Sequence, residues 1–259
     1  MQTVLFHSTI FGPIHSRRLG SSLGINLMPD DGKICSFDCL YCEAGYNAQG
    51  KGSSGLPSRE KVRIDLERKL ASMQSDGHPL DVITFSGNGE PTLHPDFADI
   101  IDDTIALRDK YFPDVKISVL TNATRIGRPA VADALRKVDN NIMKLDSAVE
   151  ATVEALDRPN AGYSLEKTIE YLAGFGEQGI VQTMMCCGEH DGTIIDNTTD
   201  EEVEALIAAY RVIKPREIML YTIDRPTPEI NLKRVSKDKL DSIAARITAA
   251  TGIPVQVSA

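Results

Sequence analysis

The chain has 259 residues, of which 42% are apolar and 25% are charged, and it contains no tryptophan. This length and composition can bury one sizeable core, which predicts a single domain over residues 1–259 and excludes disordered, collagen-like and low-complexity proteins. Acidic residues outnumber basic ones by 37 to 28, for a net charge of −9. That balance disfavours a broad phosphate-binding face for nucleic acid.

The sequence shows no sign of a membrane anchor or a secretory leader. Its first twelve residues lack a basic start and a long apolar run, and no later apolar run approaches the ~20 residues needed to cross a bilayer. We therefore expect a cytoplasmic protein without membrane contact. In that compartment the five cysteines are expected to be metal ligands, redox groups or core residues rather than disulfides.

Apolar runs typical of strands alternate with segments of helical periodicity between about residues 22 and 235. Ser58 and Ser164 are suited to cap helices, Pro129 suits a first helical turn, and Thr199 with Glu202 has capping-box spacing. The predicted strands are residues 23–28, 80–85, 116–121, 142–145, 180–185 and 217–223. The predicted helices begin near residues 58, 95, 129, 164, 199 and 236, and a short apolar tail follows at residues 253–257.

This alternation predicts an α/β fold with a parallel sheet, right-handed crossovers and outer helices. A closed barrel of eight units needs about 250 residues, whereas six units already use most of this chain. We therefore predict a partial (βα)6 barrel with an N-terminal lead-in before residue 22 and a C-terminal helix after residue 235. A doubly wound open sheet is the alternative. Both folds place functional residues at the carboxyl ends of the strands.

Three of the five cysteines, Cys35, Cys39 and Cys42, follow the first predicted strand with C-x3-C-x2-C spacing. Thiolates on one short loop can bind zinc, copper(I) or an iron–sulfur cluster. A structural zinc site needs a fourth protein ligand, usually from a second close cysteine pair, and the sequence has no second C-x2-C pair. A 4Fe-4S cluster held by three cysteines instead leaves one iron without a protein ligand.

The cysteine loop, with an aromatic residue before its last cysteine, resembles the signature of the radical S-adenosylmethionine (SAM) enzymes. The resemblance implies a 4Fe-4S cluster on Cys35, Cys39 and Cys42, with the open iron chelating the amino and carboxylate groups of SAM. In that family an electron from the cluster cleaves SAM, and the resulting 5′-deoxyadenosyl radical abstracts hydrogen from a substrate. It also implies a reducing electron donor such as flavodoxin or ferredoxin.

The resemblance extends to residues that bind SAM in that family. Tyr41 resembles the aromatic residue that lies near the adenine, although a ring packed beneath the loop is the alternative. The run Gly87, Asn88, Gly89 and Glu90 resembles the Gly-Gly-Glu element that binds the amino group of SAM, with Asn88 inserted between the glycines. Two glycines permit close backbone approach, and a plain glycine-rich turn is the alternative.

Short polar residues end the third and fourth predicted strands. Asn122 ends the third, and Asp146 with Ser147 ends the fourth. By resemblance to the family, these side chains would bind the ribose hydroxyls or the carboxylate of SAM. Each could instead cap the helix that follows.

Two further segments supply candidate substrate-binding residues. Arg17 and Arg18 precede the first predicted strand, and they could bind an anionic substrate group, close the open side of the barrel or be solvated. Tyr221, Asp224 and Arg225 follow or end the sixth strand. These three could hold a polar substrate, and a surface ion pair that fixes the loop is the alternative.

Cys186 and Cys187 are adjacent in the fifth predicted strand, so their side chains point to opposite faces of the sheet. We interpret them as small buried hydrophobic residues. A thiol that donates hydrogen to a substrate radical, or a metal site with His190, are the alternatives.

Several phrases, including FGPIHSRRLG, FSGNGEPTLHPDF and TIDRPTPE, resemble radical SAM enzymes related to those that form wyosine in phenylalanine tRNA. Those enzymes are expected to carry a second cluster on cysteines ahead of the loop, whereas the first cysteine of this chain is Cys35. We therefore expect a single-cluster enzyme with a small polar substrate rather than tRNA. A tRNA-modifying enzyme of wyosine type and a non-catalytic zinc-binding protein are the alternatives.

Overall fold

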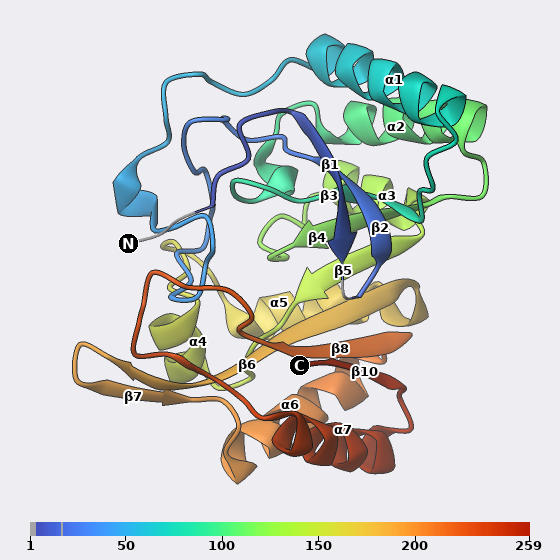
Figure 1. The fold of residues 1–259 in the computed structure, drawn as a ribbon. Coiled ribbons are helices and arrows are strands. Elements are labelled where there is room, and N and C mark those ends of the chain that lie inside the picture. The colour runs from blue at the N-terminus through green and yellow to red at the C-terminus, as the bar shows by residue number, and fades with distance from the viewer. Residues whose placement is uncertain (1–3, 17) are drawn as a thin grey trace.

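Over residues 4–16 and 18–259, which the computed structural model describes, ten strands form one curled sheet with helices on its outer side (Figure 1). The strands are β1 (Ile10–Ser16), β2 (Gly20–Ile25), β3 (Val82–Phe85), β4 (Lys116–Thr121), β5 (Asn140–Lys144), β6 (Gly179–His190), β7 (Thr193–Asp196), β8 (Glu217–Thr222), β9 (Lys233–Arg234) and β10 (Val255–Ser258). The helices are α1 (Arg59–Ser75), α2 (Phe97–Tyr111), α3 (Pro129–Lys137), α4 (Glu150–Leu156), α5 (Leu165–Ala173), α6 (Asp200–Ile213) and α7 (Lys237–Thr251). Short 3-10 helices are η1 (Asn47–Gln49), η2 (Pro91–Leu93) and η3 (Gly176–Gln178). Among these described helices, none is long and apolar enough to cross a membrane.

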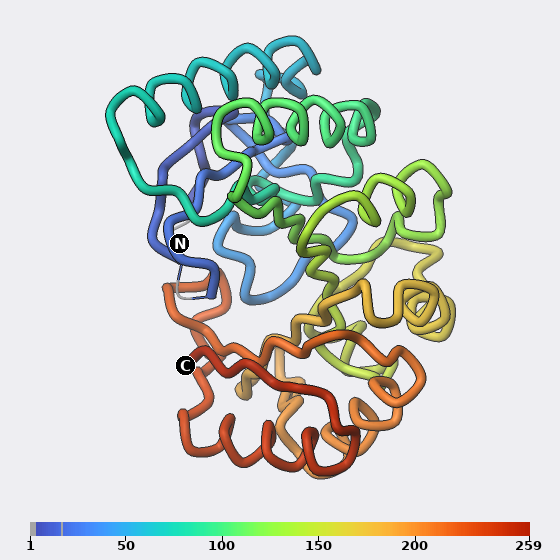
Figure 2. The backbone as a smooth tube through the Cα atoms, turned by 90° about the vertical axis from the view of Figure 1, so that its right-hand side faces the viewer, coloured from blue at the N-terminus to red at the C-terminus, as the bar shows by residue number. Residues whose placement is uncertain are grey.

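Strands β2, β3, β4, β5, β6 and β8 lie side by side in chain order, each parallel to the next. A doubly wound sheet would reverse its strand order, so this arrangement is that of a βα barrel. Figure 2 shows the helices following one another around the outer side, with the C-terminal end of the chain on the opposite side. Within the described residues the barrel stays open, because β1 and β10 occupy the two edges of the sheet. The predicted partial (βα)6 barrel is confirmed.

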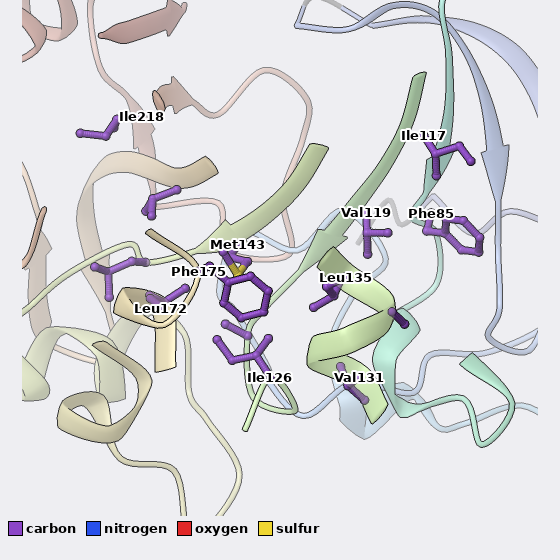
Figure 3. Packing of buried hydrophobic residues seen from close by; sticks show 14 of the residues in the cluster. Phe85, Ile117, Val119, Ile126, Val131, Leu135, Met143, Leu172, Phe175 and Ile218 are labelled. Atoms are coloured by element: carbon purple, nitrogen blue, oxygen red, sulfur yellow. The ribbon is translucent and has the colours of Figure 1, made fainter. Parts of the chain in front are cut away.

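Neighbouring residues of the inner strands face opposite sides of the sheet, as the period of two requires. Met143 and Val181 pack in the main hydrophobic cluster beneath the helices, whereas the adjacent Ile142 and Ile180 belong to a separate small cluster. Figure 3 shows part of the main cluster, in which side chains from the inner strands pack with those of α3 and α5. The helix-covered face thus buries the main core, whereas the concave face carries the smaller apolar cluster together with polar side chains such as those of Ser22 and Thr84.

Local signals in the sequence set most element boundaries. Ser58 and Ser164 cap α1 and α5, and the predicted strand at residues 116–121 coincides with β4. The first inner strand is shifted, because β2 ends at Ile25 rather than at residue 28. Asn26 explains the early end: its side-chain amide bonds to both the N–H and the carbonyl of Met28, which turns the chain.

Several elements were not predicted. The apolar tail forms β10, which joins β8 as a parallel strand. Strand β6 continues to His190, beyond the predicted end at residue 185, because β7 and β9 pair with its extension. Strand β1 contains Gly12 and Pro13 and a register shift against β2, which obscure its alternation.

Replacing Ile83 with alanine is expected to lower the free energy of unfolding by about 2–5 kcal/mol, because the side chain is fully buried in the main cluster. Ile194→Ala is the matched control, since that side chain is 74% exposed. Urea unfolding of both variants measures the difference. Equal losses in the two variants would contradict the assignment of the β3 side chain to the core.

Candidate functional site

The cysteine loop lies on the carboxyl side of the sheet, where the loops after β3, β4 and β6 also gather (Figure 1). The N–H of Leu40 donates to the carbonyl of Leu156 at the end of α4 (3.0 Å). The N–H of Cys42 donates to the carbonyl of Cys39 (3.1 Å), which forms a turn between the last two cysteines. Backbone contacts therefore fix the loop to the barrel.

The thiols of Cys35, Cys39 and Cys42 share one partly buried environment. Cys39 is buried, and Cys35 and Cys42 pack against the same small apolar cluster. Burial raises the pKa of Cys39 well above its ordinary value of 9.0 and raises the pKa of Cys35 to about 12. These two free thiols are therefore protonated at neutral pH, and metal binding would have to displace their protons.

The donor set fits an iron–sulfur cluster held by three cysteines. In residues 4–16 and 18–259, no three His, Cys, Asp or Glu side chains form a group around a single metal ion. An iron–sulfur cluster does not require the three sulfur atoms to surround one metal ion, because each thiolate binds its own iron atom. The N–H of Phe37 also bonds to the sulfur of Cys35, and such hydrogen bonds are a known influence on clusters.

The loop after β3 reaches the cysteine loop through Gly89, which forms a parallel bridge with Ile34. The N–H of Glu90 donates to the carbonyl of Ile34 (3.0 Å), and the N–H of Ile34 donates to the carbonyl of Asn88 (3.1 Å). Gly89 has a φ of +141°, and a Cβ at this position would lie 1.9 Å from the carbonyl oxygen of Ile34. The close approach of the two loops therefore requires glycine.

Asn88, which separates the two glycines, is buried with its side chain engaged inside the protein. Its Nδ2 donates to the carbonyls of Phe6 (2.9 Å) and Pro29 (2.8 Å), and its Oδ1 accepts from the N–H of Phe6 (2.9 Å). Its own N–H donates to Oδ1 of Asn26 (3.0 Å). Both amide hydrogens of Asn88 thus fasten the N-terminal lead-in and the chain after β2 to the site.

Glu90 is 2% exposed and joins the loop after β3 to the end of β4. Its Oε1 accepts from the hydroxyl of Thr121 (2.6 Å) and the N–H of Thr92 (3.1 Å), and its Oε2 accepts from the N–H of Asn122 (2.7 Å). Burial raises the pKa of Glu90 above its ordinary value, and these donors oppose that shift. The carboxylate therefore has a structural partner on each oxygen.

Asn122, at the end of β4, contacts the segment that contains the first cysteine. Its Nδ2 donates to the hydroxyl of Ser36 (2.9 Å) and lies 3.5 Å from the sulfur of Cys35. Its Oδ1 accepts from the N–H of Thr124 (3.1 Å), as in a turn-forming asparagine. Asn122 therefore both shapes the turn after β4 and contacts a predicted cluster ligand.

Asp146, which follows β5, is buried together with Tyr41 and Lys144. Its Oδ1 accepts from the N–H of Met184 (2.9 Å), and its Oδ2 accepts from the Tyr41 hydroxyl and the Lys144 ammonium (3.1 Å). Lys144 also donates to the Tyr41 hydroxyl. Burial alone would lower the pKa of Lys144, but the charge of Asp146 and other nearby groups outweighs burial and raises it. The ammonium therefore remains charged.

Asp157 completes this buried group. Its carboxyl accepts a hydrogen bond from the thiol of Cys39 and shares another with Asp146. The Tyr41 hydroxyl lies 3.4 Å from its Oδ1. Burial, followed by the charge of Asp146, raises the pKa of Asp157 well above its ordinary value of 3.8 and so favours its protonated form. The cysteine loop thus contacts a buried group made of Asp157, which favours its neutral form, and the ion pair of Lys144 with Asp146.

Ser147 connects the end of β5 to α6. Its hydroxyl donates to Oε2 of Glu202 (2.6 Å) and accepts from the N–H of Val149 (2.8 Å). Thr199 caps α6 by accepting from the N–H of Glu202 (3.3 Å), as its spacing predicts. The carboxylate of Glu202 bonds to Ser147, so the reciprocal half of the capping box is replaced by a tertiary contact.

Arg18 spans the open side of the barrel. Its Nη1 donates to Oε1 of Gln182 on β6 (3.0 Å), and its guanidinium lies 4.4 Å from the ring centroid of Tyr221 on β8. These contacts join the β1–β2 hairpin to the far strands, which is the closing role considered from the sequence. Arg17 lies outside the described residues.

A cavity of about 300 Å³ adjoins Arg18. Its lining includes Ser22 of β2, Thr84 of β3 and Ser86, and the hydroxyls of Ser22 and Thr84 are 2.8 Å apart. Hydroxyl groups and a guanidinium thus line part of this space, and apolar side chains such as Phe11 and Leu120 line the rest.

Asp224 and Arg225 line the same cavity. Arg225 forms an ion pair with Glu43, which follows the cysteine loop (2.9 Å), and both side chains are exposed. The structure thus uses Arg225 to fasten the loop after β8 beside the cysteine segment. Exposed ion pairs of this kind contribute little to stability.

Cys186 and Cys187 face opposite sides, as predicted. Cys186 is fully buried in the apolar cluster that contains Cys39, and its N–H donates to Oδ1 of Asn197 (3.0 Å). Cys187 is partly exposed, so the interpretation of both cysteines as buried residues is wrong for Cys187. His190 Nδ1 lies 2.6 Å from a carboxylate oxygen of Glu229, so its ring is engaged in a hydrogen bond. The packing agrees with the interpretation of Cys186 as a core residue.

Sequence reasoning missed Lys33, Lys144 and Asp157 as site residues. Lys144 carried a usable signal, because it is a charged residue within a predicted inner strand. Lys33 lies two positions before the first cysteine, within reach of the loop. Asp157 gave no such signal, since its role depends on the position of α4 against the loop.

Comparison with known proteins identifies a matching family. The sequence model described as the radical SAM superfamily matches residues 31–210. This span contains the cysteine loop, the Gly87–Glu90 run and the ends of β4, β5 and β6.

Individual relatives match most of the chain. A UPF0026 protein of Synechocystis sp. is 30% identical over 275 residues, covering 95% of each chain. A protein of Brachyspira hyodysenteriae named GTPase Obg is 27% identical over 253 residues, and the match covers 96% of this chain but 35% of that protein. The crystal structure of a radical SAM methyltransferase from Sphaerobacter thermophilus superimposes with a TM-score of 0.66 at 16% identity, covering 92% of this chain and 65% of that chain. At that identity the likeness shows the fold alone.

Gly89→Ala is expected to destabilise the protein by about 1–3 kcal/mol or more, because the new Cβ would collide with the Ile34 carbonyl. Gly55→Ala is the matched control: Gly55 also has a positive φ, of +73°, but has open space around it. Thermal unfolding and iron content after reconstitution measure the effect. Equal behaviour of the two variants would show that the bridge to Ile34 is dispensable.

The contribution of Asp157 to the free energy of unfolding of the metal-free protein is expected to fall as pH rises above about 4, by at most ~1.4 kcal/mol per pH unit. The folded state retains the Asp157 proton that the unfolded chain releases near 3.8, so rising pH favours unfolding. Asp157→Asn imitates the protonated acid and should flatten this slope, whereas Asp133→Asn, at a 70% exposed side chain, should not. Urea unfolding between pH 5 and 8 provides the test, and an unchanged slope in Asp157→Asn would refute the assignment.

Proposed function

The chain belongs to the radical SAM superfamily, and from this membership we propose that it is a single-cluster enzyme that abstracts hydrogen from a small polar substrate. Members of the superfamily are enzymes that cleave SAM by a radical mechanism. The observation that carries the proposal is the backbone bridge that joins the three-cysteine loop to the Gly87–Glu90 loop. This bridge brings a candidate cluster site beside a candidate SAM site at the carboxyl ends of the strands.

In this proposal Cys35, Cys39 and Cys42 would hold a 4Fe-4S cluster. When bound, the cluster would supply the electron for reductive cleavage of SAM, the chemistry that leads to hydrogen abstraction from a substrate and release of 5′-deoxyadenosine. A one-electron donor such as flavodoxin or ferredoxin provides the reducing electron. The chain itself positions the reactants and limits the access of water.

We assign the amino group of SAM to the backbone of the loop after β3. Gly87 and Gly89 let this loop pack closely, since a Cβ would lie 2.6 Å from Oδ1 of Asn26 at Gly87 and 1.9 Å from the Ile34 carbonyl at Gly89. The side chain of Asn88 is engaged with Phe6 and Pro29. Glu90 acts mainly by holding this loop against the end of β4, because both of its oxygens have partners there. The backbone thus supports the proposed contact better than the inserted asparagine does.

The remaining candidate SAM contacts fall into two groups. Asn122 lies beside Cys35, and this position supports assigning its amide to a contact with SAM. Tyr41, Asp146 and Ser147 are linked to the buried support beneath the loop, and we assign them to orienting the adenosine side of the site. Their hydrogen bonds to Lys144 and Glu202 fix their orientation before SAM binds.

We place the substrate in the cavity beside Arg18, on the concave face of the sheet. Arg18, Asp224 and Arg225 line this space, and the guanidinium of Arg18 is held over the ring of Tyr221. A volume of about 300 Å³ suits a small molecule, and the net charge of −9 disfavours tRNA. The supporting observations therefore favour a small polar substrate.

Cys39→Ala is expected to abolish both the cluster absorbance and the release of 5′-deoxyadenosine, because a ligand is removed. Cys186→Ala is the control, since this buried cysteine lies outside the ligand set and should retain both. Reconstitution without air, followed by metal and sulfide analysis and reduction with dithionite in the presence of SAM, tests the pair. The proposal requires about four irons and four sulfides per wild-type chain. A colourless protein with one zinc ion, or loss of the cluster in Cys186→Ala, would overturn the assignment.

A further inference from the structure

Lys33 is a buried basic residue in the segment that leads into the cysteine loop. Its side chain is 2% exposed, and its backbone N–H donates to the carbonyl of Gly50 (3.1 Å). Lysine is seldom buried unless it is paired, because taking an ammonium group out of water is costly. Its position therefore needs an electrostatic reason.

The contacts of Lys33 place its ammonium inside the turn formed by the cysteine segment. Nζ donates to the carbonyl of Gly45 (2.7 Å), and the N–H of Gly45 donates to the carbonyl of Cys42 (2.9 Å). Nζ also lies 3.6 Å from Oδ1 of Asp38, a residue between the first two cysteines. The amine thus contacts the loop on both sides of Cys39.

The charge of Asp38 is divided among several partners. Its Oδ1 accepts from the N–H of Asn47 (2.6 Å), and its Oδ2 lies 3.2 Å from the guanidinium of Arg158. Two cations therefore share this one carboxylate. The positive charge of Lys33 is left partly available to other negative groups in the loop.

The cysteines are those negative groups once they lose their protons. Lys33 lies two positions before Cys35, its Nζ bonds to the carbonyl of Gly45 just after Cys42, and it lies beside Asp38, which directly precedes Cys39. The buried ammonium is therefore held within the segment that carries all three proposed ligands.

We propose that Lys33 is a positioning residue whose fixed positive charge makes the cluster held by Cys35, Cys39 and Cys42 easier to reduce. This inference rests on the proposed function. Reduction by a one-electron donor adds one electron to the site and moves no atom, so the site gains one negative charge. A buried ammonium stabilises the more negative state more than the less negative one, and little water is present to screen it. Neutralising Lys33 should therefore move the midpoint potential to a more negative value.

The experiment separates the charge of Lys33 from its hydrogen bond to Gly45. Lys33→Met removes the charge and the donor, Lys33→Gln removes the charge and keeps an amide donor, and Lys33→Arg keeps the charge. Lys51→Met is the matched control, because it makes the same change in net charge at an exposed lysine on a nearby segment. The midpoint potential of each reconstituted protein is measured by redox titration monitored by electron paramagnetic resonance, with iron and sulfide content determined on the same samples.

We expect a more negative midpoint potential in both Lys33→Met and Lys33→Gln, and a wild-type potential in Lys33→Arg and Lys51→Met. Wild-type potentials in Lys33→Met and Lys33→Gln at full iron content would overturn the inference while leaving the proposed function intact. Failure of the wild-type chain to assemble a cluster would instead overturn the proposed function.

A second variant keeps the inference testable if the neutral Lys33 variants do not fold. Asp38→Asn keeps an oxygen that can accept from Asn47, but it removes the negative charge next to Lys33. The same electrostatic argument requires its midpoint potential to become more positive. A wild-type potential in Asp38→Asn at full iron content would overturn the inference on its own.

Discussion

The backbone bridge between Ile34 and Gly89 is the contact on which the geometry of the site depends. From this bridge a chain of contacts runs through Glu90 to the N–H of Asn122, and the Asn122 amide returns to Cys35, next to Ile34. The circuit joins three segments that are far apart in the sequence. Because a side chain at Gly89 would occupy the position of the Ile34 carbonyl, the circuit closes only with glycine there. Movement of either strand end would therefore displace the first cysteine.

The fold was largely predictable because its determinants are local and periodic. Each inner strand is an apolar run that changes faces every residue, and helix starts such as Ser58 and Ser164 accept hydrogen bonds three residues ahead. The elements that were missed depend on partners. Strand β10 has four residues and becomes a strand by pairing with β8, and the extension of β6 exists because β7 and β9 pair with it. Segments this short contain too few alternations of apolar and polar residues to be recognised as strands from the sequence alone.

The candidate site, like the fold, has parts that local sequence patterns predict and parts that depend on tertiary contacts. The cysteine spacing is a local signal, so the proposed ligands could be selected from the sequence. The roles of Asn88 and Asp157 could not, because each depends on a tertiary contact: Asn88 with the N-terminal lead-in, and Asp157 with the thiol of Cys39. A polar residue after a strand could equally bind a ligand, cap a helix or support a loop. Ser147 illustrates the ambiguity, since its hydroxyl bonds both to the next turn and to Glu202.

The charges around the cysteines differ from those of the chain as a whole. A net charge of −9 would oppose the addition of an electron if all charges acted equally. They do not, because exposed charges are screened over roughly 8 Å at physiological salt, whereas buried charges are screened far less. Lys33 is 2% exposed and Lys144 is 12% exposed at their side chains, and Asp157 favours its neutral form. The two buried ammonium groups thus offset the carboxylates of Asp38 and Asp146 near the cysteine loop, so the net charge of the whole chain does not by itself set the local cost of adding an electron.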